Sequence, residues 1–279
     1  MEEFTTAAAM RVFSREARSR GARIGLVPTM GALHQGHVSL VGRARTECGA
    51  VVVSIYVNPL QFGPREDFSA YPRDLERDKD HLRASGCDVL FVPQDREIHV
   101  PGHRTTVEVQ GLQDLLCGRS RPGHFRGVTT VVAKLLAIVQ PDVAYFGEKD
   151  AQQVRIIRRM ALDLHEEVRI VSCPIMREAD GLAMSSRNIY LSAEERRAAP
   201  VLYRALRAAA ERARSGETDA ARLASLVRET IAREPLARID YVEAVDGETL
   251  EPVTTTRLGL LLAVAVWFGR ARLIDNIIL

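Results

Sequence analysis

The chain has 279 residues, enough for one large domain or two unequal ones, and a hydrophobic share of 46% that is ordinary for a globular protein. Its formal net charge is only +2, so it lacks the basic excess of a dedicated nucleic-acid binder. The longest apolar run, 258–268, is about half the length that crosses a bilayer. With no signal-peptide pattern and four dispersed cysteines that form no CxxC pair, we expect a cytoplasmic protein without nucleic-acid or membrane partners.

Short β-branched runs alternate with amphipathic stretches over the first 175 residues. The predicted strands are 24–27, 51–57, 89–92, 143–146 and 168–171, and the predicted helices are 68–84, 128–139 and 151–164. Alternation at this spacing predicts βαβ units and a parallel sheet with helices on both faces. Ligands of such sheets bind at the carboxyl ends of the strands, so the chemistry is expected there.

The pattern changes after about residue 175. The predicted elements are a loop at 176–191, a long helical region at 193–214, a helix at 219–233, a strand at 239–245, a turn at Asp246-Gly247 and a core strand in the run 258–268. We interpret this part as a small α+β domain with antiparallel strands.

The segment VPTMGALHQGH at 27–37 follows the first predicted strand. Pro28 and Gly31 end that strand, and apolar periodicity restarts after His37, where we expect a helix to begin. A strand, a glycine turn and a helix N-terminus form a natural phosphate site, in which His34 and His37 can donate to phosphate oxygens. Gly36 lets a nucleotide approach the backbone. The alternative is a polar turn whose histidines only cap the helix.

Polar side chains also follow two further predicted strands. Asn58 and Gln61 come after the second strand, where amides can bind a polar substrate, although Asn58 before a proline alone favours an ordinary turn. Lys149 and Asp150 follow the fourth strand at a predicted helix N-terminus, which suits the neutralisation of ATP phosphates. Lys149 is one of only three lysines, and the alternative for it is an exposed turn residue.

Two loops carry cationic groups. Ser185, Ser186 and Arg187 lie in the loop that enters the second domain, where hydroxyls and a guanidinium can bind triphosphate oxygens and move with a hinge. The alternative is a helix-capping loop. The segment RPGHFRG at 121–127 is, on its own, typical of an ordinary loop.

Taken together, these segments resemble the pantoate–β-alanine ligase family. The resemblance runs nearly end to end through VPTMGALHQGH, SIYVNPLQFG, GHFRGV, FGEKDAQQ, READGLAMSSRN and RLIDN. It implies a Rossmann-like, doubly wound α/β domain at 1–175, a smaller C-terminal α+β lid domain at 176–279, and a homodimer. The HxGH pattern itself is also typical of nucleotidyltransferases and class I aminoacyl-tRNA synthetases.

The resemblance further implies the reaction. Pantoate and ATP, with Mg²⁺, form pantoyl adenylate and pyrophosphate, and the amine of β-alanine then attacks the adenylate to give pantothenate and AMP. A carboxylate needs no general base at neutral pH, so the first step depends on positioning and on neutralisation of phosphate charge.

The resemblance also implies roles for individual residues of this chain. The expected catalytic residues are His37, His34, Lys149, Ser185, Ser186 and Arg187. The expected ATP-binding residues are Met30, Gly31, Ala32, Leu33, His34, Gln35, Gly36, His37, Gly147, Glu148, Lys149, Asp150, Met176, Met184, Ser185, Ser186 and Arg187. The expected substrate-binding residues are Gln61, Gln153, Thr29, Met30 and Asn58. Asp78 is the candidate ligand for Mg²⁺, although phosphates and water are an alternative set of ligands.

Two other functions fit parts of the pattern. A different HxGH enzyme would transfer a nucleotidyl group, release the conjugate and ignore β-alanine. A catalytically inactive nucleotide sensor would keep the fold but lose reactive groups. The glutamines at 61 and 153 and the MSSRN loop favour the ligase over the former, and intact His34, His37, Lys149 and Arg187 argue against the latter.

Overall fold

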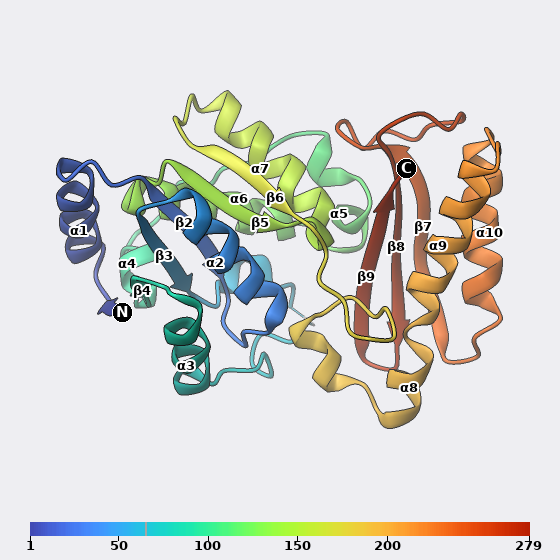
Figure 1. The fold of residues 1–279 in the computed structure, drawn as a ribbon, viewed down its shortest axis with the longest axis horizontal. Helices are drawn as coiled ribbons and strands as arrows, with labels where there is room; N and C mark the ends of the chain where they lie inside the picture. The colour runs from blue at the N-terminus through green and yellow to red at the C-terminus, as the bar shows by residue number, and fades with distance from the viewer. Residues whose placement is uncertain (65) are drawn as a thin grey trace.

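The structure, a computed structural model of the chain, describes residues 1–64 and 66–279. Its first part is built on a parallel sheet with strand order β1-β4-β3-β2-β5-β6 (Figure 1). The strands are β1 Glu2–Phe4, β2 Ile24–Thr29, β3 Ala50–Ile55, β4 Val89–Phe91, β5 Val143–Gly147 and β6 Arg169–Cys173. From β2 the chain extends the sheet to one side through β3 and β4, then to the other through β5 and β6. This order confirms the predicted Rossmann-like sheet, and its direction reverses between β2 and β5.

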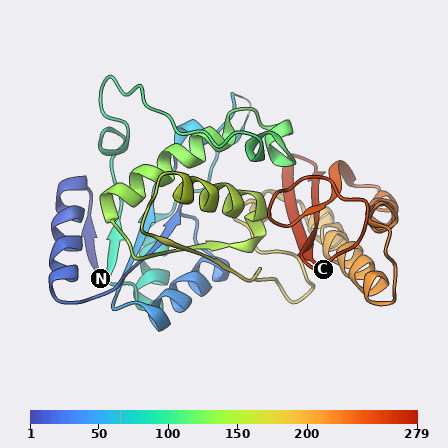
Figure 2. The same ribbon diagram turned by 90° about the horizontal axis from the view of Figure 1, so that it is seen from above.

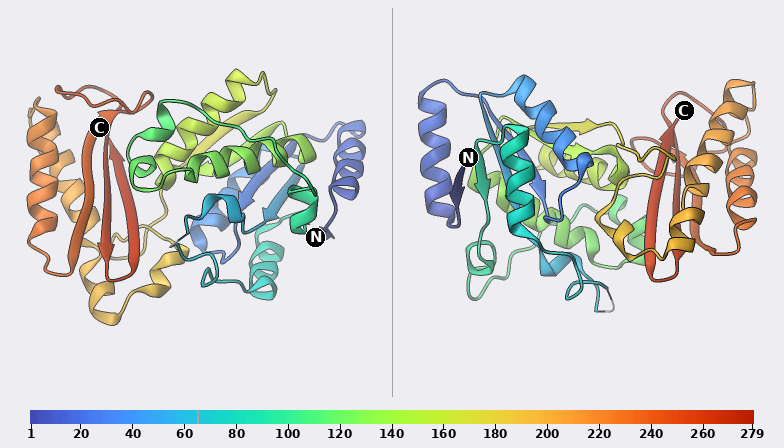
Figure 3. Two further views of the ribbon diagram at one scale, coloured as in Figure 1. Left: turned by 180° about the vertical axis from the view of Figure 1, so that it is seen from behind. Right: turned by 60° about the horizontal axis from the view of Figure 1, so that its bottom comes forward.

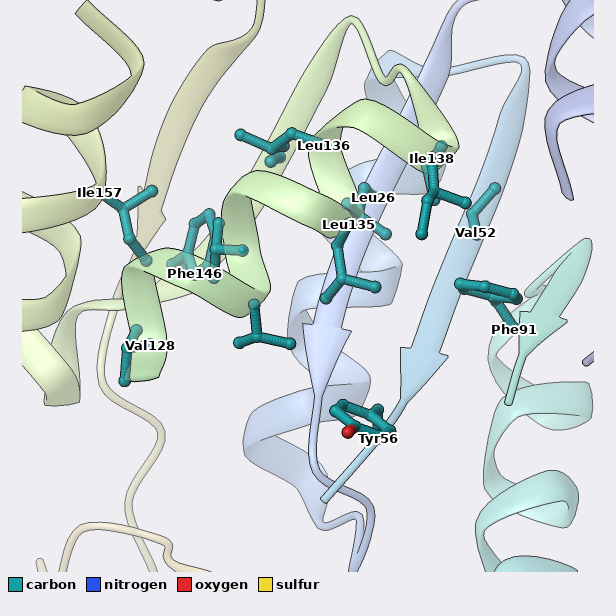
Figure 4. Close-up of a cluster of buried hydrophobic side chains, with 14 of the residues drawn as sticks. Leu26, Val52, Tyr56, Phe91, Val128, Leu135, Leu136, Ile138, Phe146 and Ile157 are labelled. Atoms are coloured by element: carbon teal, nitrogen blue, oxygen red, sulfur yellow. The ribbon is translucent and has the colours of Figure 1, made fainter. Parts of the chain in front are cut away.

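Helices cover both faces of this sheet. The helices of the first part are α1 Ala7–Ser19, α2 Gln35–Glu47, α3 Leu75–Ser85, α4 Asp95–Ile98, α5 Cys117–Ser120, α6 His124–Val139 and α7 Ala151–Asp163, with 3-10 turns η1 Pro59–Gln61, η2 Leu112–Asp114 and η3 Glu148–Asp150. Leu26 and Val52 pack with α1, α6 and α7 on one face (Figure 4), whereas their neighbours Val27 and Val53 pack with α2 and α3 on the other. Because successive side chains of a strand face opposite ways, burial on both faces explains the continuous apolar runs.

The second part is a three-stranded antiparallel sheet, β7-β8-β9, covered on one face by helices. Its elements are η4 Ser186–Tyr190, α8 Ala193–Ala198, α9 Val201–Arg214, α10 Ala220–Ala232, β7 Ala237–Asp246, β8 Leu260–Phe268 and β9 Ala271–Ile278. The sheet stands beside the first part, with α9 and α10 on its outer side (Figures 1 and 2). The predicted core strand in the run 258–268 is confirmed as β8.

Several boundaries and elements differ from the sequence predictions. The helix predicted at 68–84 begins only at Leu75, where the Asp74 side chain accepts from the Arg77 N–H, because Pro72 interrupts the preceding stretch. The long helix predicted at 193–214 is two helices, broken before Val201 at Pro200. β1, α1 and β9 were not predicted. β1 is only three residues long, and β9 lacks the strand alternation because Asp275 and Asn276 are adjacent polar residues.

Within the described residues, no helix is long and apolar enough to span a membrane. The four cysteines are free thiols, and all are buried.

The start of α6 packs directly on the turn η1, and Gly127 makes this approach possible. A Cβ at Gly127 would lie 2.2 Å from the carbonyl oxygen of Leu60 and 2.6 Å from the backbone nitrogen of Gln61. α6 crosses the face of the sheet at this point (Figure 3). The position of Gln61 therefore depends on a glycine that is distant in sequence.

We expect Gly127→Ala to lower the free energy of unfolding by about 1–3 kcal/mol, because backbone atoms of η1 must move to accept the methyl group. Gly42→Ala is the matched control, since a Cβ there meets nothing within 4 Å and alanine favours a helix by up to about 1 kcal/mol. Urea unfolding of both variants checks this. A Gly127→Ala protein as stable as Gly42→Ala would contradict the close packing.

Candidate active site

A cavity lies at the carboxyl ends of β2 and β5, where the strand order reverses, and it is closed on one side by the segment that leads to the second part. Its volume is about 220 Å³. Residues far apart in sequence, such as Thr29 and Arg187, thus face one space. Most of the predicted site residues line it together: Thr29, Met30, His34, Gly36, His37, Gln61, Gly147, Lys149, Asp150, Gln153, Met176, Met184, Ser185, Ser186 and Arg187.

His34 and His37 are tied to the first turn of α2 by their own side chains. His34 Nδ1 accepts from the Gly36 N–H at 3.1 Å, and His37 Nδ1 accepts from the His34 N–H at 3.3 Å. The two predicted roles therefore coincide, because the histidines cap the helix and also line the cavity. Since a backbone N–H can only donate, each ring is neutral with its proton on Nε2. That Nε2–H is the group each ring can offer to a ligand.

The surroundings of the two rings favour this neutral form. Burial, followed by the charge of Lys149, lowers the pKa of His34 to about 4. Burial also lowers the pKa of His37 well below its ordinary value, and the neighbouring His34 and Lys149 add to the effect. The ring centroids are only 4.1 Å apart, so two charged imidazoles would repel each other strongly. The pair therefore donates hydrogen bonds without carrying charge near pH 7.

Gly36 lines the cavity and also accommodates the ring of His34. A Cβ at this position would lie 2.7 Å from Cε1 and 2.8 Å from Nδ1 of His34. The absence of a side chain therefore first makes room for the His34 ring, which folds back over the helix N-terminus.

Lys149 supplies a full positive charge to the cavity. It lies in the turn η3 after β5, its side chain is 19% exposed, and its ammonium is 3.5 Å from a carboxylate oxygen of Asp150. The neighbouring Glu148 points elsewhere: its carboxylate pairs with Arg155, and it does not line the cavity. From this position the side chain of Glu148 does not reach the cavity, so it does not make the predicted nucleotide contact.

Several other predicted site residues lie outside the cavity lining, in or next to the loop that carries the lining residues. Gly31, Ala32, Leu33 and Gln35 do not line the cavity, and Leu33 is a core residue that is 2% exposed. Asp78 is buried beneath this loop, where its two carboxylate oxygens accept from the backbone N–H groups of Ala32 (2.9 Å) and Leu33 (2.7 Å). The geometry makes Asp78 a support of the loop instead of a group that faces a nucleotide-bound metal.

Asn58 is also a support and not a lining residue. Its side-chain amide donates to the Gly127 carbonyl (3.0 Å) and to Gln61 Oε1 (3.2 Å), and its Oδ1 accepts from the Leu60 N–H (3.3 Å). It is 1% exposed and lies outside the cavity lining. Because its donors are taken by the protein, the predicted direct contact of Asn58 with substrate is replaced by control over the orientation of the Gln61 amide.

The structure adds two residues to the site, both from the segment 121–127 that the sequence alone predicted to be an ordinary loop. Arg121 and His124 line the cavity beside Gln61. His124 Nδ1 donates to the Gln61 carbonyl oxygen (2.8 Å), and Arg121 pairs with Glu66 at 2.6 Å. Burial, followed by Arg121, lowers the pKa of His124 to about 3, which keeps this ring neutral as well. The GHFRGV motif was the available signal.

The segment 184–187 contacts the loop that precedes α2. Ser186 Oγ donates to the Ala32 carbonyl at 3.3 Å, and Ser185 caps the turn η4, as the alternative prediction for this loop requires. Arg187 lines the cavity while its guanidinium is paired with Asp67 through two hydrogen bonds of 2.9 and 3.1 Å. For Arg187 to bind phosphate oxygens, this ion pair must be shared or exchanged.

The described residues offer no ready-made metal centre. Within 1–64 and 66–279, no group of three or more His, Cys, Asp and Glu side chains is placed to hold a metal ion. Asp67 is occupied by Arg187, Glu66 by Arg121, and Asp78 by backbone N–H groups. The donors present do not fit a protein-held Mg²⁺ site.

A Rossmann-like sheet with neutral imidazoles at a helix N-terminus and a lysine at the reversal of strand order defines a nucleotide-binding α/β enzyme. Comparison with known proteins specifies the family. The family model described as pantoate-beta-alanine ligase matches residues 2–278. The chain belongs to the pantoate–β-alanine ligase family.

Curated relatives and solved structures agree with this membership. The chain is 58% identical to the pantothenate synthetase of Heliobacterium modesticaldum over 96% of each chain. It is 54% identical to that of Pelotomaculum thermopropionicum, covering 98% of this chain and 97% of the relative. The crystal structure of pantothenate synthetase from Thermus thermophilus superposes with a TM-score of 0.94 at 48% identity, covering 99% of each chain. A Francisella tularensis pantoate-beta-alanine ligase, complexed with beta-gamma ATP and beta-alanine, gives a TM-score of 0.81 at 34% identity, covering 100% of this chain and 97% of that one.

The buried neutral histidines predict a loss of stability in mild acid. An unfolded chain protonates its histidines below about pH 6.5, whereas in the folded state His34 and His124 bind protons only near pH 4 and 3. The part of the free energy of unfolding that depends on these two histidines is therefore largest above pH 6.5, and it declines as the pH falls toward 4. We expect the urea midpoint to drop between pH 7 and 5.

Replacement of one ring isolates this effect from the titration of carboxylates. His124→Gln, which keeps a neutral hydrogen-bonding side chain, should show a weaker decline than the unmodified protein. His165→Gln, at an exposed position, should leave the decline unchanged. Parallel pH profiles for His124→Gln and the unmodified protein would show that His124 is not a source of the dependence.

Proposed function

We propose that this protein condenses pantoate with β-alanine at the expense of ATP, giving pantothenate, AMP and pyrophosphate through a pantoyl adenylate. The observation that carries the proposal is the meeting, in one cavity, of two neutral imidazoles and Lys149 with the amides of Gln61 and Gln153. The first set suits a triphosphate and the second suits a hydroxy acid. The Francisella relative complexed with beta-gamma ATP and beta-alanine supports ATP and β-alanine as ligands, and the assignment of pantoate rests on the two glutamines and the family membership.

In the first step, a carboxylate oxygen of pantoate attacks the α-phosphorus of ATP. The bond between that phosphorus and the oxygen leading to the β-phosphorus breaks, and pyrophosphate leaves with the electron pair. Negative charge builds on the phosphate oxygens, where Lys149 and the Nε2–H groups of His34 and His37 can stabilise it. The imidazoles need no proton transfer for this role, which agrees with their buried neutral state.

In the second step, the uncharged amine of β-alanine attacks the acyl carbon of the adenylate. The C–N bond forms, the C–O bond to AMP breaks, and the amine loses its proton to solvent or to the departing phosphate. Water would hydrolyse the same anhydride, so the site must exclude it. We assign this role to Ser185, Ser186 and Arg187, and the contact of Ser186 with the loop before α2 supports the assignment.

The glutamines place pantoate in this scheme. Asn58 holds Gln61 Oε1, and Gln61 Nε2 donates one N–H to Met30 Sδ at 2.8 Å, so the second N–H of Nε2 is the donor left for the acid substrate. Gln153 lines the same cavity from the first turn of α7, and Thr29 and Met30 line it from the end of β2. This set is the proposed pantoate subsite.

Further parts of the proposal depend on the family resemblance. They are a homodimer, a cytoplasmic location, and a division at about residue 175 into a nucleotide-binding domain and a C-terminal lid. Mg²⁺ enters only as a companion of the ATP phosphates, because the described donors of this cavity do not form a protein site for it.

The first experiment measures pyrophosphate release from ATP, Mg²⁺ and pantoate, with and without β-alanine, and identifies the products by mass. A stoichiometric burst without β-alanine, followed by turnover to pantothenate and AMP on its addition, is the expected result. Continuous formation of a stable nucleotide conjugate would identify a nucleotidyltransferase instead. ATP binding without any product would identify a sensor.

His37 should be required for the first step. We expect His37→Ala to slow adenylate formation by about two to four decades, because it removes a donor at developing phosphate charge. Rapid-quench measurement of the pyrophosphate burst checks this, with circular dichroism to confirm folding and His165→Ala as the matched control. A burst rate close to that of the control would remove His37 from the mechanism.

A further inference from the structure

The RLIDN motif at 272–276 has no role in the reaction as described so far. It lies on β9, an edge strand of the three-stranded sheet that pairs only with β8 in the described part of the chain. Figure 1 shows β9 as the strand of this sheet nearest to the first part of the molecule. An edge strand in this position can send side chains across the junction between the two parts.

Asn276 crosses that junction with two hydrogen bonds. Its Nδ2 donates to the Glu148 carbonyl at 2.9 Å and to the Lys149 carbonyl at 3.1 Å. The side chain is buried, with 4% of the residue exposed. Because both acceptors are backbone oxygens, the amide orientation is fixed, and the bonds hold the path of the turn η3 instead of any side chain on it.

Lys149 depends on that turn for its placement. In the part of the chain that the structure describes, its ammonium has one ion-pair partner, Asp150, at 3.5 Å. A contact of this length does little to fix a flexible four-carbon side chain. The position of the ammonium in the cavity is therefore set mainly by the backbone from which the side chain extends.

The preceding residue of β9 makes a matching contact with the other side of the cavity. Asp275 accepts two hydrogen bonds from Arg177, at 2.6 and 2.9 Å, and Arg177 lies in the segment that continues to Ser185 and Arg187. Consecutive residues of a strand point in opposite directions. Asp275 and Asn276 can therefore hold two different segments of the cavity wall from one strand.

We propose that Asn276 is a positioning residue for Lys149, and that it couples the C-terminal sheet to the placement of the phosphate-binding ammonium. The inference rests on the proposed function, since it assigns Lys149 to ATP. It adds a residue that touches no substrate and acts through the backbone of Glu148 and Lys149. In its absence the turn can shift, and a displacement of about 1 Å in a catalytic group costs on the order of 10²-fold in rate.

The test compares Asn276→Ala with Ser120→Ala. Ser120 Oγ donates to Asp240 at 2.8 Å, so its loss breaks a hydrogen bond between the same two parts that does not involve the turn η3. We expect Asn276→Ala to raise the KM for ATP and to lower kcat, so that kcat/KM for ATP falls by about ten- to a hundredfold. The KM for pantoate should change little. Ser120→Ala should match the unmodified protein in kcat, in the KM for ATP and in the KM for pantoate.

A double-mutant cycle with Lys149→Ala separates positioning from general damage. If Asn276 acts through Lys149, Asn276→Ala should cost almost nothing further in the Lys149→Ala background. Equal losses in both backgrounds, or a folded Asn276→Ala enzyme with the kinetics of Ser120→Ala, would overturn the inference. Thermal unfolding establishes folding, and Asn276→Asp, which keeps the shape but loses the donors, takes the place of Asn276→Ala if the latter does not fold.

Failure of the proposed function is distinguishable from failure of this inference. If the unmodified protein and Ser120→Ala form no pantothenate, the function is wrong. Calorimetric binding of ATP to Asn276→Ala and to Ser120→Ala still reports on Lys149 without any chemistry. Equal ATP affinities of these two variants would contradict the positioning role by themselves.

Discussion

The cavity depends on a short backbone loop held in an uncommon conformation by the carboxylate of Asp78. Gly31 and Ala32 both have positive φ, +80° and +49°, and for alanine this costs on the order of 1–3 kcal/mol. Two backbone N–H groups that donate to one carboxylate offset part of that cost, while burial raises the pKa of the Asp78 carboxyl group. The loop in turn delivers His34 to the N-cap of α2, so the imidazole pair rests on a residue of α3.

Burial gives this site its chemical character. Three of its imidazoles, those of His34, His37 and His124, have lowered pKa values because they are enclosed and face cationic neighbours. The positive charge is thereby concentrated on Lys149 and on the paired guanidiniums, while the rings act as neutral donors of fixed tautomer. A site of this kind can respond to charge that develops on phosphate oxygens without first losing or gaining a proton.

The sequence predicted those parts of the structure that leave a local pattern. The β-branched strands, the helix after His37, and the lining residues Lys149 and Gln153 follow from periodicity, turn chemistry and motif resemblance. The supporting residues escaped prediction or were given direct roles. Asn58 and Asp78 were expected to contact ligands, yet both are buried and bind the backbone of segments that carry lining residues. Such pairings join distant segments, and spacing in one sequence does not reveal them.

The difference between residues that line the cavity and residues that support it applies to the whole site. Three of the lining segments are each held by a group from elsewhere in the chain: the loop before α2 by Asp78, Gln61 by His124, and Arg187 by Asp67. The nearby Asn58 adds a local contact to Gln61. Asn276 completes this set from the C-terminal sheet. A cavity assembled in this way loses a support of Lys149 when its two parts are separated, because one part carries Lys149 and the other carries the amide that holds its backbone. In the reaction we propose, the junction that shields the anhydride from water is therefore also the junction that aligns the groups that form it.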